Sequence, residues 1–440
     1  MNDMNKRLNG AKDLVFDAVE ETTTLVQQMH ALTADKSFQP LSLIEPLATL
    51  SQAVKTVHDT TAAGVYEMIR IINRGIEKML DAGTDLVAGG LVLARKTNAG
   101  GMEETPLIPP RAWETTSKDM VIDQCEAILN GLYGDYLAKK ENTLDLGMNF
   151  RHRGKVLPLN KASFNQAFPD ATAKICVFVH GLMCTEMSWR IGAEKFYGNP
   201  DVNFGSRLEA DLGYTPLFVR YNTGRHISEN CRRLSGLLAG LMDAWPVPVT
   251  EIVLVGHSMG GLVSRGAAYY ANKENAPWLA RLRHIVCVGS PHLGAPLEKA
   301  ANLLGALLRA FNTAGTQAPA RVLNARSAGI KDLRFGCTLD DEWSKQDPDA
   351  FLKNNRQNLP LVDGVGYFFI AATLTADPDH PLGRLVGDIL VRVPSAVGRH
   401  KDPARSIPFS SGHVFTGMDH LHMANHPDVY QAIREFLGPL

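Results

Sequence analysis

The chain lacks the cysteine pattern of a disulfide-stabilised or zinc-binding protein. Its six cysteines are scattered over 440 residues, and no two of them form a C-x-x-C pair. Three stand in or beside apolar, strand-like runs, where a free thiol behaves as a small apolar side chain. We therefore expect a reduced, intracellular protein without a disulfide framework or a thiolate metal site.

Two further features are missing: an excess of charge of one sign and a long hydrophobic run. The 45 Lys and Arg residues nearly balance the 46 Asp and Glu residues, so no general attraction to nucleic acid is expected. The first ten residues contain no apolar core of a secretory signal, and the best apolar window, residues 86–94, is too short to span a bilayer. These absences indicate a cytoplasmic protein, with peripheral association with a membrane left open.

Residues 1–110 are predicted to form a helical N-terminal region. Apolar side chains recur at helical spacing within residues 14–29 and 65–80, and the proline-rich segment 105–110 follows as a linker. We expect these helices to pack on a core. Contact with a second copy of the chain or with a membrane surface stays open, although Lys and Arg do not dominate the polar faces as they do on membrane-surface helices.

Residues 118–440 are predicted to form one catalytic domain of the α/β class. After a helix at 120–136 and a hairpin around Arg153-Gly154-Lys155, apolar runs predict five buried strands: 175–179, 216–221, 252–255, 285–288 and 367–372. Strands of this kind that alternate with helices are typical of a mostly parallel sheet with helices on both faces. The functional residues of such a sheet lie at the carboxyl ends of its strands.

The segment 296–363 is too long for a simple crossover between two strands. It contains an apolar, helix-like stretch at residues 300–311. We interpret the segment as a lid insertion that covers an acyl chain and excludes water; an ordinary packed surface helix is an equal alternative.

Residues 251–261 carry the strongest functional signal in the chain. A β-favouring run passes through Gly-His-Ser-Met-Gly directly into a helical pattern. This is the succession of strand, sharp turn and helix that exposes a serine hydroxyl above a parallel sheet. Gly256 and Gly260 flank the turn, where side chains would block the close approach of strand and helix. We interpret Ser258 as a nucleophile; the alternative is an ordinary strand-to-helix turn.

A serine hydroxyl is a weak nucleophile near neutral pH, so it needs a base, an orienting carboxylate and oxyanion donors. In chain order the acid follows the serine and the histidine comes last. Asp388 is the predicted acid because it follows the strand-like run 367–372. Asp377 and Asp379 compete for this role, but their neighbouring prolines favour an exposed turn.

The base is expected in the loop before a last helix at residues 431–437. His420 and His422 alternate in this extended loop, so only one of them faces the sheet, and we choose His420. His426 precedes a proline at the helix start and is interpreted as structural. A zinc site made of the three histidines matches no helical metal motif and lacks an acidic or thiolate partner. Neither a metal nor an organic cofactor is expected.

The oxyanion hole requires two backbone amides, one of them directly after the nucleophile. Met259 supplies this amide, and Leu182, in the loop after strand 175–179, supplies the other. His180 is expected to hydrogen-bond the backbone of that loop. The remaining candidates also lie near strand ends: His180, Met183, His257 and His292 for contact with substrate, and Arg220, Arg225 and His226 for a substrate head group or for internal ion pairs.

Four motifs together resemble the lipase and esterase branch of the α/β-hydrolase superfamily: His180-Gly-Leu, Gly256-His-Ser-Met-Gly-Gly, Ser290-Pro-His-Leu-Gly-Ala-Pro and Gly387-Asp-x-x-Val. Bacterial triacylglycerol lipases and the glycosylphosphatidylinositol inositol-deacylase group share this set, and the resemblance covers roughly residues 150–440. Segments 220–225 and 326–334 are similar to those of bacterial hydrolases with a helical N-terminal extension. The resemblance implies the α/β-hydrolase fold and serine catalysis. Ile389 departs from it, because relatives commonly have glycine after the acid.

The expected function is that of a serine carboxylic-ester hydrolase, a lipase or esterase that forms an acyl-enzyme from a small-molecule or lipid ester. An acyltransferase or a depolymerase of stored polyester would use the same triad. A non-catalytic interaction protein, whose N-terminal helices recruit a partner, is the third alternative.

Overall fold

The computed structural model describes residues 117–295, 327–344, 356–375, 388 and 390–438, together with residues 24, 27 and 28. The predicted N-terminal helices, and residues 296–326 and 345–355 of the predicted lid, lie outside these ranges. Residues Glu126–Leu440 form one compact unit.

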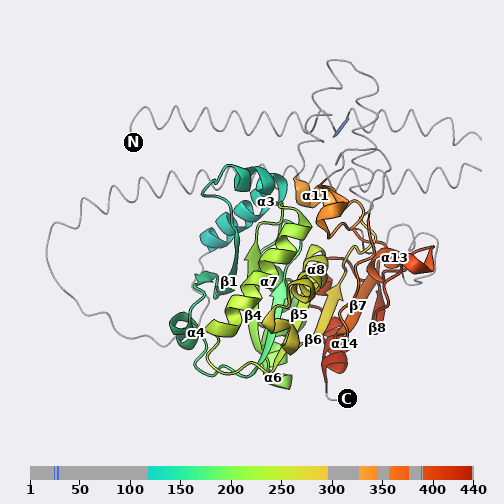
Figure 1. Cartoon of the computed structure of the whole chain (residues 1–440). Helices are drawn as coiled ribbons and strands as arrows, with labels where there is room; N and C mark the ends of the chain where they lie inside the picture. Colours follow the sequence, from blue (N-terminus) through green and yellow to red (C-terminus); the bar gives the residue numbers. More distant parts are fainter. Residues whose placement is uncertain are drawn as a thin grey trace, which may run out of the picture. The chain divides into compact units, whose positions relative to one another are not determined.

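The unit is built on one eight-stranded sheet in the order β2-β1-β4-β3-β5-β6-β7-β8 (Figure 1). Strands β3 to β8 run parallel, whereas β1 is antiparallel to both of its neighbours. The bounds of the strands are β1 Met148–His152, β2 Lys155–Leu157, β3 Lys174–Val179, β4 Thr215–Tyr221, β5 Glu251–His257, β6 Leu282–Val288, β7 Gly366–Thr373 and β8 Ser411–Thr416.

Nine segments of the described chain form α-helices: α3 Ser117–Lys139, α4 Lys161–Ala167, α5 Ala193–Tyr197, α6 Phe204–Leu212, α7 Ile227–Ala244, α8 Met259–Glu274, α11 Ala328–Asp332, α13 Val393–Ala396 and α14 Pro427–Leu437. Short 3-10 turns complete the described part: η1 Glu186–Arg190, η2 Pro277–Arg281, η3 Asp340–Glu342, η4 Pro403–Arg405 and η5 His422–Ala424.

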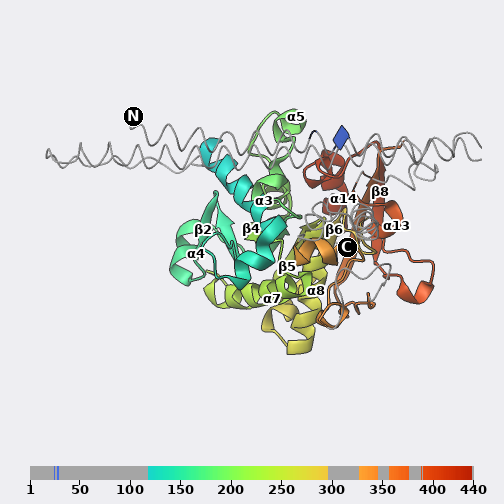
Figure 2. The same ribbon diagram turned by 90° about the horizontal axis from the view of Figure 1, so that it is seen from above.

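Alternate residues of the central strands build two separate cores. In β3, Ile175 and Val177 face one core, which α4, α7 and α8 cover, while Cys176 and Phe178 face the other, which α6 and α14 cover. Figure 2 shows α7 and α8 on one side of the sheet and α14 on the other. Burying one large apolar side chain is worth about 1.5–3 kcal/mol, so a strand that is apolar on both faces is held firmly in the middle of the sheet.

The structure confirms the five predicted strands and adds elements that the pattern did not reveal. The predicted hairpin is present, and Arg153 and Gly154 both adopt positive φ values in its two-residue turn, as a tight hairpin requires. Strand β8 was not predicted, because it is a largely exposed edge strand without an apolar run. The last helix begins at Pro427, four residues before the predicted start, since proline is well accommodated in a first helical turn.

Candidate active site

Ser258 lies in the sharp turn between β5 and α8. Its backbone adopts φ 54° and ψ −122°, a conformation that costs energy for a residue with a side chain and persists only where the surroundings hold it. The turn is tight: a Cβ atom at Gly256 would lie 2.4 Å from the Gly260 backbone, and one at Gly260 would lie 2.1 Å from the Val179 carbonyl oxygen. The two glycines therefore let α8 start directly against β3 and β5.

His420 and Asp388 form a buried hydrogen-bonded pair. The distance from His420 Nδ1 to Asp388 Oδ2 is 2.8 Å, and the two side chains are 4% and 1% exposed. The amides of Leu390 and Val391 donate to Asp388 Oδ1 at 3.0 and 2.7 Å. Because a carboxylate only accepts, His420 Nδ1 carries the proton and Nε2 is able to take one.

This pair lies beside the serine turn at the carboxyl end of the sheet. The Ser258 amide donates to the carbonyl of Val288 at 2.8 Å, and a Cβ atom at the next residue, Gly289, would lie 3.2 Å from the His420 ring. His257 Nε2 donates to the His420 carbonyl at 2.9 Å. The Ser258 hydroxyl itself forms no hydrogen bond within the described part of the chain, as is common before substrate tightens such a site.

The two residues predicted to supply the oxyanion amides are close to the serine in the structure. Met259 is the first residue of α8, so its amide has no acceptor within the helix. Leu182 follows Gly181, where a Cβ atom would lie 3.0 Å from Ser258 Cβ. The loop after β3 thus passes directly over the serine, and it contains Met183 with φ 58°.

The histidines that were predicted to contact substrate form hydrogen bonds with other groups of the protein. His180 Nδ1 donates to the Gly181 carbonyl at 2.9 Å, and His292 Nδ1 accepts from Arg265 at 2.9 Å. Burial lowers the pKa of His180 and of His257 to about 3. Burial, with the nearby charge of Arg265, also lowers the pKa of His292. These rings are therefore neutral at neutral pH and do not compete with His420 for a proton.

The alternative acid and base residues fall into different surroundings. Asp377 and Asp379, like Ile389, lie outside the described residues. His422 pairs with Asp419 at 2.5 Å on the surface, and the His426 side chain accepts from the Asp428 amide and caps α14. No group of metal-ligating side chains occurs within the described ranges.

The three basic candidates at the end of β4 and just after it make internal ion pairs. Arg220 bonds both carboxylate oxygens of Glu186, which the sequence pattern did not single out. Arg225 contacts Asp145 at 2.6 Å. His226 contacts a different partner, Asp332, at 3.1 Å. Of the two roles predicted for these residues, the structure therefore shows internal pairing.

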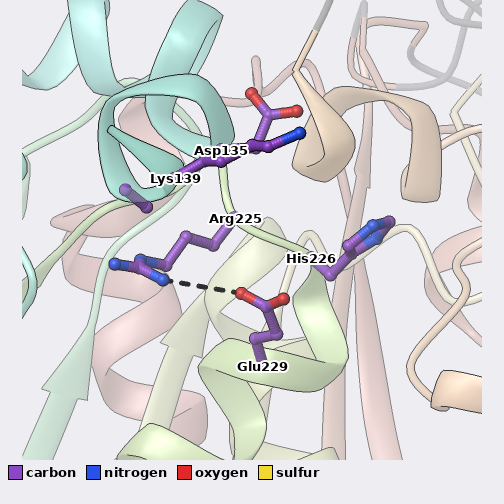
Figure 3. Close-up of a pocket in the computed structure, with 6 residues that line it drawn as sticks. Asp135, Lys139, Arg225, His226 and Glu229 are labelled. Atoms are coloured by element: carbon purple, nitrogen blue, oxygen red, sulfur yellow. Dashed lines mark ion pairs between the residues drawn. The ribbon is translucent and has the colours of Figure 1, made fainter. Parts of the chain in front are cut away.

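A cavity of about 210 Å³ opens beside Arg225 and His226 (Figure 3), lined also by Asp135, Ala138, Lys139 and Glu229. Arg225 points toward Glu229 across it, with 3.7 Å between nitrogen and oxygen. None of Ser258, Asp388 and His420 lines this cavity, and its acidic and basic groups offset one another. It is therefore not the centre of the predicted chemistry.

Comparison with known families agrees with this architecture. Residues 220–355 match the model of a family described as the PGAP1-like alpha/beta domain. The matched segment contains β5, the serine turn and α8. The mostly parallel sheet with helices on both faces confirms the predicted fold class, and the family match over residues 220–355 agrees with the predicted resemblance.

Solved structures that are similar to this chain include three lipases or esterases. The propeptide form of the Bacillus licheniformis lipase BlEst2 has a TM-score of 0.40 and 18% identity over 61% of this chain and 51% of its own, so the match spans about half of that lipase. The Pyrococcus furiosus esterase Pf2001 has a TM-score of 0.33 and 13% identity over 60% and 81%. Esterase B of Lactobacillus rhamnosis has a TM-score of 0.32 and 15% identity over 61% and 75%.

A comparison with curated proteins gives no significant match. In the described part of the chain, no helix has the length and apolar character needed to cross a membrane.

Proposed function

We propose that the protein is a serine carboxylic-ester hydrolase with Ser258, His420 and Asp388 as its catalytic triad. The observation that carries this proposal is the buried His420–Asp388 pair, 2.8 Å apart, held beside a serine whose backbone has the strained conformation of an exposed nucleophile turn. A neutral imidazole held in this tautomer is suited to take a proton from a neighbouring hydroxyl.

In the proposed reaction, Ser258 Oγ attacks the ester carbonyl and its proton passes to His420 Nε2. The amides of Leu182 and Met259 donate to the oxyanion of the tetrahedral intermediate. The intermediate collapses when His420 returns the proton to the departing alcohol, which leaves an acyl-enzyme. Water, deprotonated by His420, then releases the carboxylic acid and restores the serine.

The test combines labelling with hydrolysis. A fluorophosphonate probe is expected to modify the wild-type protein at Ser258, and short p-nitrophenyl esters are expected to be hydrolysed. Ser258→Ala should abolish both signals, while Ser264→Ala, on the same helix with its hydroxyl bonded to the Gly260 carbonyl, should keep both. Full hydrolysis by the Ser258→Ala protein would refute the proposal.

A further inference from the structure

We propose that the buried Glu186–Arg220 ion pair is a positioning device that holds the loop of residues 180–186 in the shape needed for oxyanion binding. The proposal rests on the proposed function, because it assigns a role in the same site. Neither residue is placed to touch the reacting atoms. Both act through the backbone of the loop that contains Leu182.

The pair joins the end of one strand to the far end of this loop. Arg220 is the penultimate residue of β4, and Glu186 begins η1. Arg220 Nε and Nη2 donate to the two carboxylate oxygens of Glu186, each at 2.7 Å, and both side chains are fully buried. A two-pronged bond of this kind fixes direction as well as distance.

The residues that follow Arg220 hold the near part of the loop. The Tyr221 hydroxyl donates to the His180 carbonyl at 2.9 Å, and the two rings stack with centroids 4.6 Å apart. The Met183 amide donates to Thr223 Oγ1 at 3.2 Å. The stretch 220–223 therefore bonds the loop on both sides of Leu182, at His180 before it and at Met183 and Glu186 after it.

The loop needs such support because one of its residues has an unfavourable backbone conformation. Met183 has φ 58°, a left-handed conformation that is unfavourable for a residue with a side chain and that persists only under outside constraint. If the loop relaxed, the neighbouring Leu182 amide would turn away from Ser258. A misplacement of about 1 Å in a catalytic group can lower a rate by about 100-fold.

A buried ion pair is a poor means of stabilising a fold. Removing two charges from water offsets most of their attraction, and apolar side chains of similar size are often at least as stabilising. What apolar side chains do not supply is the fixed direction of two parallel hydrogen bonds. The geometry of Glu186 and Arg220 thus points to loop position, rather than stability, as the property that the pair controls.

The experiment replaces both charges together, so that no unpaired charge stays buried. For Glu186→Leu/Arg220→Met we expect normal folding, a kcat for p-nitrophenyl butyrate lowered by about 10- to 100-fold, and a KM within about threefold of wild type. The inhibition constant of a boronic acid, which mimics the tetrahedral intermediate at Ser258, should rise by the same factor as kcat/KM falls.

The matched control is Arg232→Met/Asp340→Leu, which removes another arginine–carboxylate pair in the same compact unit, with side chains 37% and 36% exposed. This control should leave kcat and the boronic acid constant unchanged. Arg220→Lys keeps the charge but loses the planar fork. It should therefore give an intermediate loss, and it serves as the decisive variant if the double substitution does not fold.

Hydrogen exchange measured by mass spectrometry separates this proposal from the proposed function. Amides of residues 181–187 should exchange faster in Glu186→Leu/Arg220→Met than in wild type, while those of α7 and α8 should not. Wild-type protein without esterase activity would refute the proposed function, yet the exchange result would still decide whether the pair holds the loop. Unchanged exchange, or wild-type kcat and inhibitor affinity in the folded variant, overturns the inference.

Discussion

Two histidine–aspartate pairs with a buried aspartate lie near the carboxyl ends of the strands in the described part of the chain, and only one of them adjoins a serine turn. His420 and Asp388 are 2.8 Å apart, and His226 and Asp332 are 3.1 Å apart. The His420 ring packs against the backbone at Gly289, next to the acceptor of the Ser258 amide. The pairs are alike in chemistry and differ in what surrounds them.

The second pair joins two helices. Asp332, at the end of α11, also accepts the amide of Ile227 at the start of α7, at 2.9 Å. The His226 ring lies flat on Trp343, with centroids 3.5 Å apart. One face of the His226 ring is thus covered by Trp343, whereas the His420 ring lies beside the serine turn. The difference teaches that neighbours, and not the pair itself, decide whether such a histidine is suited to catalysis.

We expect the largest effect on activity when the Ser258 hydroxyl is removed. Ser258 lies beside the His420–Asp388 pair and not beside the His226–Asp332 pair. Ser258→Ala should lower kcat for a short p-nitrophenyl ester by at least about 10⁴-fold. The melting temperature should fall little, since no hydrogen bond of the Ser258 hydroxyl is lost in the described structure. Steady-state kinetics and thermal unfolding check the two statements. A loss of less than tenfold would remove Ser258 from the mechanism.

Matched substitutions in the two aspartates test the comparison directly. Asp388→Asn should lower kcat by about 10³- to 10⁴-fold, because the amide no longer holds the imidazole in the required tautomer. Asp332→Asn should change kcat by less than about threefold but lower the free energy of unfolding by about 1–3 kcal/mol, as it weakens the buried hydrogen bonds to α7. Equal losses of kcat in both variants would show that the two pairs do not differ in their effect on catalysis.

The second pair should also make stability depend on pH. Burial lowers the pKa of His226, but the hydrogen bond and charge of Asp332 outweigh it and raise that pKa above its usual value. Burial raises the pKa of Asp332 as well. The folded protein therefore holds a proton here more tightly than the unfolded chain does, and this stabilisation is lost as pH rises through the raised pKa of His226.

His226→Phe keeps a ring on Trp343 and removes the titrating group. The free energy of unfolding of wild type relative to this variant should be greatest below about pH 6.5. It should shrink by about 1–2 kcal/mol as the pH rises beyond the pKa of His226. Chemical denaturation at pH 5.5, 7 and 8.5 measures the trend. A difference that grew with pH would show that the pair does not hold the proton.

The smallest effect is expected at the surface histidine that competes with His420 in the sequence. His422 pairs with Asp419, and its side chain is 42% exposed. An exposed pair contributes about 0–1 kcal/mol, so His422→Asn should leave kcat within about twofold and the melting temperature nearly unchanged. His420→Asn, measured in parallel, should lose nearly all activity. The reverse ranking would transfer the role of base to His422.

The fold was predictable where burial imposes a pattern. The strands at 175–179 and 252–255 are apolar on both faces because both faces are covered, and the sequence shows this as continuous runs. Strand β8 escaped prediction because an exposed edge needs no such run. It pairs through its backbone with β7, and backbone pairing imposes little on side-chain type.

The candidate site likewise contains residues that a local sequence pattern reveals and residues that it does not. The serine turn is local, since its glycines and its strand and helix lie within about a dozen residues, and a sequence pattern is sufficient to find it. Glu186 offered no comparable signal, because its partner Arg220 lies 34 residues away. Asp388 was reached only through the chain order of the acid and base in α/β-hydrolases.

By itself, the sequence determined which segments form the buried strands of the sheet and where the candidate serine stands, because periodicity, glycine and turn geometry act over short stretches of chain. The tertiary structure decided which histidine meets which aspartate and which charged residues pair beside the loop after β3. Those contacts join residues 32, 34 and 106 positions apart. Only the folded sheet, which gathers the ends of its strands at one edge, brings such distant groups within hydrogen-bonding distance.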